Sequence, residues 1–195
     1  MIILASQSPR RQELLKLTGL PFTVRAADID ETMDKSLPVQ QEVTRVSRLK
    51  AQAIAAGASP DDIVIAADTI VVIDGRELGK PHSEAEALDM LRLLSGRTHE
   101  VVTVLSVCRG THIESEAVVT KVTFRPLCEE ELRAYVRTGE PMDKAGSYGI
   151  QGYGAMFVSR IEGDYFSVMG LPLCPLCQML RAFGVRILDV QEAQA

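Results

Sequence analysis

Two adjacent arginines, Arg10 and Arg11, directly follow a serine and a proline near the start of the chain. Ser8 is a good N-cap and Pro9 a good first helical residue, so both arginines are expected in the first turn of a helix. Cations there oppose the positive end of the helix dipole, which costs roughly 0.3–1 kcal/mol each. A bound anion, with phosphate the obvious candidate, would offset that cost. The alternative is a solvated pair whose charge is partly offset by Glu13.

A single carboxylate, Asp68, interrupts an apolar, β-branched run. Residues 63–67 predict a buried strand that ends at Asp68 and Thr69, and residues 70–73 continue it. Ligand sites in open α/β sheets gather at strand ends, and a carboxylate held there can ligate a divalent cation or take a proton from water. The alternative is a turn aspartate that accepts bonds from nearby backbone. Glu31, in the acidic loop 26–36, is the candidate second metal ligand, with a solvated surface acid as its alternative.

Gly146, Gly149 and Gly152 recur at every third residue around Gln151. Such spacing would let the backbone approach a ligand closely. The Gln151 amide carries both donors and an acceptor, which suits the edge of a nucleobase. The alternative is a flexible loop, although long ordered loops in compact domains are usually functional.

Two lysines are candidates for binding phosphate. Residues 75–81 resemble a P-loop superficially, but the glycine spacing is one residue short and a proline stands where Ser or Thr is required, so a P-loop is rejected. Lys80 could still reach a phosphate as a point charge, as could Lys50 on the helical segment 39–56. For each lysine taken alone, a surface position is the simpler interpretation.

The elements that must position these residues alternate between strands and helices, which predicts an α/β fold with a mixed sheet. Residues 144–154 are expected to form a glycine-rich loop, and residues 189–195 a frayed tail. The expected strands are 2–5, 22–25, 63–67 continued by 70–73, 98–108, 112–124 and 156–161, and the expected helices are 9–18, 39–56, 83–94, 129–138 and 172–183.

The composition sets limits on partners and location. A chain of 195 residues with 46% hydrophobic and 24% charged residues fits an ordinary globular protein. Its net charge of −5 and lack of Trp argue against a nucleic-acid partner. No apolar run reaches the roughly 18–20 residues of a membrane span, and no signal peptide is evident, so a cytoplasmic protein is expected. Cys174 and Cys177 have redox-motif spacing without further ligands and are predicted to be small core residues.

Short motifs follow one another in order along nearly the whole chain: SQSPRR at 6–11, DE at 30–31, RLKA at 48–51, ADT at 67–69, GKP at 79–81, LSGRTH at 94–99, DKAGSYGIQG at 143–152 and GLP at 170–172. Their order and spacing resemble the Maf family of nucleoside triphosphate pyrophosphatases. The resemblance implies one domain, residues 1–195, with a Maf/inosine-triphosphatase-like fold. That fold is a bent mixed β-sheet flanked by helices, with a deep cleft between two lobes, and it usually forms a homodimer.

The resemblance also implies an activity. The family hydrolyses a nucleoside triphosphate to the monophosphate and pyrophosphate with a divalent cation, Mg²⁺ or Mn²⁺, in a house-cleaning role. The residue matching Asp68 is the proton acceptor, and those matching Arg11, Thr69 and Gln151 set the base preference. This trio resembles the subgroup that prefers dTTP and UTP. The sequence leaves open whether the natural substrate is a modified pyrimidine triphosphate.

Together, the residues and the resemblance lead to one hypothesis. Ser8, Arg10 and Arg11 hold phosphate oxygens, Lys50 and Lys80 add positive charge, and Glu31 and Asp68 hold the cation. Whether Asp68 is base, metal ligand or both stays open. The alternatives are a nucleotide-binding regulator of cell division or septum formation without turnover, and a pyrophosphatase for damaged purine nucleotides.

Overall fold

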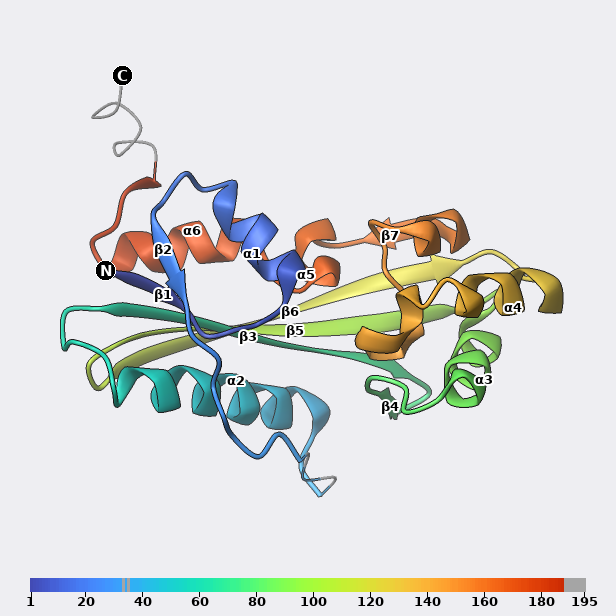
Figure 1. Cartoon of the computed structure of the whole chain (residues 1–195), viewed down its shortest axis with the longest axis horizontal. Coiled ribbons are helices and arrows are strands. Elements are labelled where there is room, and N and C mark those ends of the chain that lie inside the picture. Colours follow the sequence, from blue (N-terminus) through green and yellow to red (C-terminus); the bar gives the residue numbers. More distant parts are fainter. Residues whose placement is uncertain (33, 35, 188–195) are drawn as a thin grey trace. The chain divides into compact units, whose positions relative to one another are not determined.

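Figure 1 shows the computed structural model of the chain, which describes residues 1–32, 34 and 36–187. The expected tail, residues 189–195, lies outside the described residues. The chain divides into two compact units. Unit 1 comprises residues 1–68, 103–118 and the chain from 170 onward, and unit 2 comprises residues 69–102 and 119–169.

Among the described residues, the strands form a mixed sheet in the order β2-β1-β3-β5-β6-β7, with β4 paired to β3. The pairs of β1 with β2 and with β3 are parallel, whereas β3–β4 and β6–β7 are antiparallel. The predicted mixed α/β sheet is therefore confirmed. The strands are β1 (Ile2–Leu4), β2 (Phe22–Val24), β3 (Ile63–Ile73), β4 (Arg76–Leu78), β5 (Thr98–Arg109), β6 (His112–Phe124) and β7 (Val158–Glu162).

In unit 1, helices cover both faces of the strands (Figure 1). Helix α2 (Val39–Ala55) lies on one face, and α1 (Pro9–Lys16) and α6 (Leu173–Ala182) lie on the other. Alternate strand residues point to opposite faces, so one set of apolar side chains meets α2. Ile3, Ala5, Val64, Ala66, Cys108 and, from α2, Ala51 form a fully buried cluster. The alanines in this cluster, Ala5, Ala51 and Ala66, leave room for α2 to pack on the strands.

Unit 2 has its own core, built around Phe124, Tyr148, Phe157 and Leu91. Ser83 caps α3 as predicted, because its side chain accepts a bond from the Glu86 N–H at 3.1 Å. The helical elements of unit 2 are α3 (Glu84–Leu94), α4 (Glu129–Arg137), α5 (Tyr165–Met169) and the 3₁₀ helices η1 (Glu140–Asp143), η2 (Ala145–Ser147) and η3 (Tyr153–Phe157).

Most predicted elements are confirmed to within about two residues at each end, and the differences are local. Residues 144–154, predicted as loop, contain 3₁₀ turns, and α5 and β4 were not anticipated. Asp74 and Gly75 both have positive φ, 50° and 71°, the conformation of a type I′ hairpin turn leading into β4. A P-loop leads into a helix instead, so its rejection is confirmed.

The prediction that Cys174 and Cys177 are core residues is wrong. Cys174 is exposed, whereas Cys177 is half-buried. Both lie near the start of α6, whose buried face is formed by Leu176, Met179 and Leu180 instead. Within the described residues, every helix falls short of the length and apolarity that crossing a membrane requires.

Candidate functional site

Asp68 lies inside β3, so the predicted continuation of the strand through residues 70–73 is confirmed, and the strand does not break at Asp68 and Thr69. The parallel neighbour β1 is what ends here. Its last paired residue is Leu4, opposite Ile65, and the next N–H, from Ala5, donates to the Ile65 carbonyl at 2.7 Å. Asp68 therefore lies just past the carboxyl end of a parallel strand, where ligand sites of such sheets gather.

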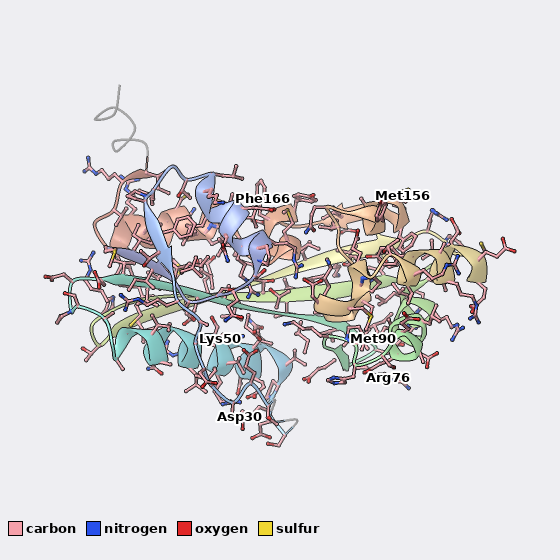
Figure 2. All side chains as sticks on the ribbon, viewed as in Figure 1. Asp30, Lys50, Arg76, Met90, Met156 and Phe166 are labelled. Carbon is pink, nitrogen blue, oxygen red and sulfur yellow. The ribbon has the colours of Figure 1, made fainter. Side chains whose placement is uncertain are left out.

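Lys50 joins the two predicted carboxylates. Its ammonium donates to Glu31 Oε2 at 2.8 Å and to Asp68 Oδ1 at 2.7 Å. Lys50 is only 7% exposed, and Figure 2 shows it on the side of α2 that faces the strands of unit 1. A buried ammonium is stable only when it is paired, and these two carboxylates provide the pairing. The surface interpretation of Lys50 is therefore wrong.

A second ion pair fixes the loop that carries Glu31. Glu42 on α2 is completely buried and accepts bonds from Arg45 Nε at 2.8 Å and from the Asp34 N–H at 2.8 Å. Arg45 also donates to the Thr32 carbonyl at 3.0 Å. The hydrogen bonds from Arg45 hold the pKa of Glu42 below its usual range, although burial alone would raise it. This pair, here called the loop clamp, ties residues 32 and 34 to α2.

Sequence reasoning missed the loop clamp, although a signal was available. Glu42 falls on the apolar face of an amphipathic helix, beside the buried residues Val43 and Val46. An acid in that position needs a buried partner. An arginine three residues later in a helix is the nearest candidate.

Arg11 lies within the electrostatic reach of the same carboxylates. Its Nε donates to the Gly170 carbonyl at 2.8 Å, and the side chain is half-buried. Burial lowers the pKa of Arg11, Asp68 raises it, Arg10 lowers it, and Glu31 raises it. The first turn of α1 is thus electrostatically coupled to both carboxylates.

Ser8 occupies the predicted N-cap position of α1, but its side chain makes no capping hydrogen bond there. The Ser8 N–H donates to Ser6 Oγ at 3.2 Å instead. The predicted capping role of the Ser8 hydroxyl is therefore wrong. Binding of phosphate by Ser8 and Arg10 stays a prediction.

The remaining predicted site residues belong to unit 2. Thr69 is half-buried in β3 directly after Asp68. Lys80 is exposed two residues after β4, and Gln151 is exposed in the turn before η3. Their predicted roles stay predictions, whereas unit 1 does bring Glu31, Lys50 and Asp68 into direct contact.

The spacing of the glycines has a structural cause within unit 2. Gly146 has a φ of +67°, and a Cβ there would lie 2.7 Å from Val71 Cγ2. A Cβ on Gly152 would lie 2.3 Å from Glu140 Oε2. The glycines thus let the backbone approach neighbouring protein groups, which accounts for them without the ligand that the sequence suggested.

We call Arg10, Arg11, Lys50, Glu31 and Asp68 the charged cluster. Cations outnumber carboxylates in it, which suits an anionic ligand. Among the residues described, no three His, Cys, Asp or Glu side chains gather to hold a metal ion. However, oxygens of Glu31 and Asp68 already converge on one cationic nitrogen, and Mg²⁺ commonly takes one or two carboxylates plus substrate phosphates. Two carboxylates held this close together are a ligand set that fits a divalent cation.

The chain matches the family model described as "Maf-like protein" over residues 1–183. A dTTP/UTP pyrophosphatase from Moorella thermoacetica is 51% identical over 189 residues, covering 95% of this chain and 96% of that protein. One from Bacillus velezensis is 46% identical over 185 residues, covering 95% and 97%. Among solved structures, a HAM1 protein from Coxiella burnetii is similar with a TM-score of 0.47 and 16% identity, over 80% of this chain and 90% of that chain.

Proposed function

This chain belongs to the Maf family, and we propose that it is a nucleoside triphosphate pyrophosphatase that hydrolyses dTTP and UTP. The products are the nucleoside monophosphate and pyrophosphate, so the bond that breaks is the α–β phosphoanhydride. The relatives named for this activity align over almost their full length with this chain. The observation that carries the proposal is the buried Lys50 that bridges Glu31 and Asp68 beside the first turn of α1.

Attack of water on the α-phosphorus needs a base for the water and cations for the phosphate oxygens. We assign the base to Asp68, since Lys50 holds one of its oxygens at 2.7 Å and thereby fixes the orientation of the carboxylate. Arg10, Arg11 and Ser8, with the N–H groups at the start of α1, take up phosphate oxygens. Lys80 is proposed to add a further positive charge.

A divalent cation completes this proposal. Glu31 and Asp68 would hold Mg²⁺ or Mn²⁺ through the carboxylate oxygens that Lys50 does not contact, and their shared contact with Lys50, which keeps the two carboxylates close together, supports this. When bound, the cation would neutralise charge that builds up on the phosphate oxygens. The net positive charge of the charged cluster is too small to balance a triphosphate alone.

Base selection is proposed for Arg11, Thr69 and Gln151. The Gln151 amide offers a carbonyl for N3–H and an N–H for a carbonyl of uracil or thymine. Cytosine presents an unprotonated N3 and an amino group, so an amide in fixed orientation would reject it. A regulator without turnover is not favoured, since the relatives are named as pyrophosphatases.

We further propose that residues 1–195 act as one domain in a cytoplasmic homodimer that binds neither nucleic acid nor membrane. The unbroken family match over residues 1–183 supports the single domain. The homodimer rests on the family resemblance. Light scattering after size exclusion would give the mass of a dimer of the 21.3 kDa chain if this is right, and of a monomer if it is wrong.

The test of the function is release of pyrophosphate from a panel of canonical and modified nucleoside triphosphates, with Mg²⁺ or Mn²⁺. We expect turnover of dTTP and UTP, and a fall in kcat of about 10²–10⁴-fold in Asp68→Asn. The matched control is Asp61→Asn, an exposed aspartate of unit 1, which should keep wild-type activity. Release of orthophosphate instead, or full activity of Asp68→Asn, would contradict the proposal.

A further inference from the structure

Glu140, the first residue of η1, collects hydrogen bonds from the segment that follows Gln151. Its Oε2 accepts from the Tyr153 N–H at 2.8 Å, and its Oε1 accepts from the Gly154 N–H at 3.1 Å. Oε1 also accepts from the Tyr135 hydroxyl at 2.8 Å. Both oxygens of one carboxylate are thus committed to neighbours within unit 2.

Tyr135 extends this arrangement to the other side of Gln151. Its hydroxyl oxygen accepts from the Gly149 N–H at 3.0 Å while its hydrogen goes to Glu140. Tyr135 is 4% exposed, and burial raises its pKa, so the hydroxyl stays protonated as the donor. Residues on both sides of Gln151 are therefore tied to one Tyr–Glu pair, here called the turn latch.

The turn latch also explains a feature of the sequence. A Cβ on Gly152 would lie 2.3 Å from Glu140 Oε2, so only glycine lets the chain pass this close to the carboxylate. Lys144, which precedes the Gln151 turn in the sequence, also supports the latch. Its ammonium donates to the backbone carbonyl of Glu140 at 2.6 Å. Glycine and carboxylate therefore fit one another as a unit.

The N–H groups of the buried residues Gly149 and Gly154 need acceptors within the protein, whereas the exposed Tyr153 could use water. Partly withdrawing the Glu140 carboxylate from water to bind this segment costs free energy. These hydrogen bonds fix the backbone on both sides of the exposed Gln151. Because that backbone sets the point from which the Gln151 side chain projects, the latch limits which base edges its amide can reach. We propose that Glu140 is a positioning residue for base selection, acting through the backbone of the Gln151 turn. This inference rests on the proposed function.

The first test is independent of activity. Amide hydrogen exchange is compared between the wild type, Glu140→Gln and the control Glu130→Gln, an exposed acid on α4. Glutamine has one acceptor oxygen and would turn an N–H toward one of the donors. We expect the Tyr153 and Gly154 amides to exchange about tenfold faster in Glu140→Gln, without change in the control. Unchanged exchange at both amides would overturn the proposal.

The second test separates positioning from a general structural role. We expect the ratio of kcat/KM for UTP over CTP to fall about tenfold in Glu140→Gln, mainly through the KM for UTP, with kcat nearly kept. Equal losses on both substrates would mean a structural role only and would overturn the proposal. If Glu140→Gln does not fold, Tyr135→Phe gives the same readout, because it removes the hydroxyl and keeps the ring against Phe157.

The two tests distinguish the inference from its premise. A wild type that hydrolyses no pyrimidine triphosphate overturns the proposed function and, with it, base selection by Glu140. In that case, the exchange data still show whether Glu140 holds the turn. An active wild type with an unchanged UTP/CTP ratio in Glu140→Gln overturns the inference alone.

Discussion

The charged cluster of unit 1 and the Gln151 turn of unit 2 are held in opposite ways. In the cluster, side chains hold side chains, as Lys50 pairs with Glu31 and Asp68. In the turn, the Glu140 carboxylate holds backbone N–H groups and leaves Gln151 exposed. The first arrangement fixes where charges lie, and the second fixes the backbone from which a neutral amide projects.

This difference leads to different consequences of mutation. Removing a charge from the cluster leaves another charge without its partner, which changes the electrostatics of the site. Removing the latch carboxylate frees a backbone segment and leaves the cluster's charges in place. Variants of the cluster should therefore lower kcat on every substrate, whereas variants of the latch should change the choice among substrates.

The largest expected effect comes from Lys50→Met. It leaves Glu31 and Asp68 close together without the ammonium, so we expect kcat to fall at least about a hundredfold on UTP and CTP alike. Steady-state kinetics on both substrates measure this, with Lys16→Met, an exposed lysine of α1, as control. A change in the UTP/CTP ratio without loss of kcat would break the comparison.

A smaller effect is expected from Glu42→Gln in the loop clamp. The substitution removes the charge of the buried side chain and with it the ion pair to Arg45, which is partly exposed. The free energy of unfolding should therefore fall by about 1–3 kcal/mol. The freed loop positions Glu31 less well, and kcat should fall about tenfold with the UTP/CTP ratio unchanged. Urea unfolding and kinetics, beside the exposed control Glu13→Gln, measure both. Lower stability with full kcat would show that the clamp does not position Glu31.

The smallest effect on activity is expected for His99 of unit 2, whose burial governs stability in acid instead. His99 is 2% exposed, its Nε2 lies 2.8 Å from the Tyr148 hydroxyl oxygen, and burial lowers its pKa from 6.5 to about 4. The unfolded chain takes up this proton below about pH 6.5, whereas the folded chain does so only near pH 4. As the pH falls from about 6.5 to about 4, proton uptake by the unfolded chain therefore favours unfolding. Above about pH 6.5, the free energy of unfolding is not reduced by His99.

Urea unfolding at about pH 7 and about pH 4.5 tests this. The wild type should lose about 2–3 kcal/mol more than His99→Gln does over that interval. Equal losses in the two proteins would mean that His99 is not held neutral by burial. His99→Gln leaves the ion pairs of unit 1 unchanged, so this dependence of stability on pH belongs to unit 2.

Local signals predicted much of the fold, and contacts distant in sequence account for what was missed. Ser83 before an acidic turn and an apolar stripe located α3, and a charge inside an apolar run located Asp68. The bridge by Lys50 joins residues 19 and 18 positions away, and Glu140 receives N–H groups from 13 and 14 positions away. The hydrophobic periodicity of a sequence predicts helices and strands, but it does not predict which distant side chains pair. The glycine pattern was visible, but Glu140, the group that Gly152 accommodates, was not.

The most direct test of the central claim is hydrolysis of UTP by the wild type in ¹⁸O-enriched water, with the products separated and weighed by mass spectrometry. The account predicts one ¹⁸O in UMP and none in pyrophosphate, because water attacks the α-phosphorus. Label in pyrophosphate, or release of labelled orthophosphate, would place the attack on another phosphorus and contradict the account.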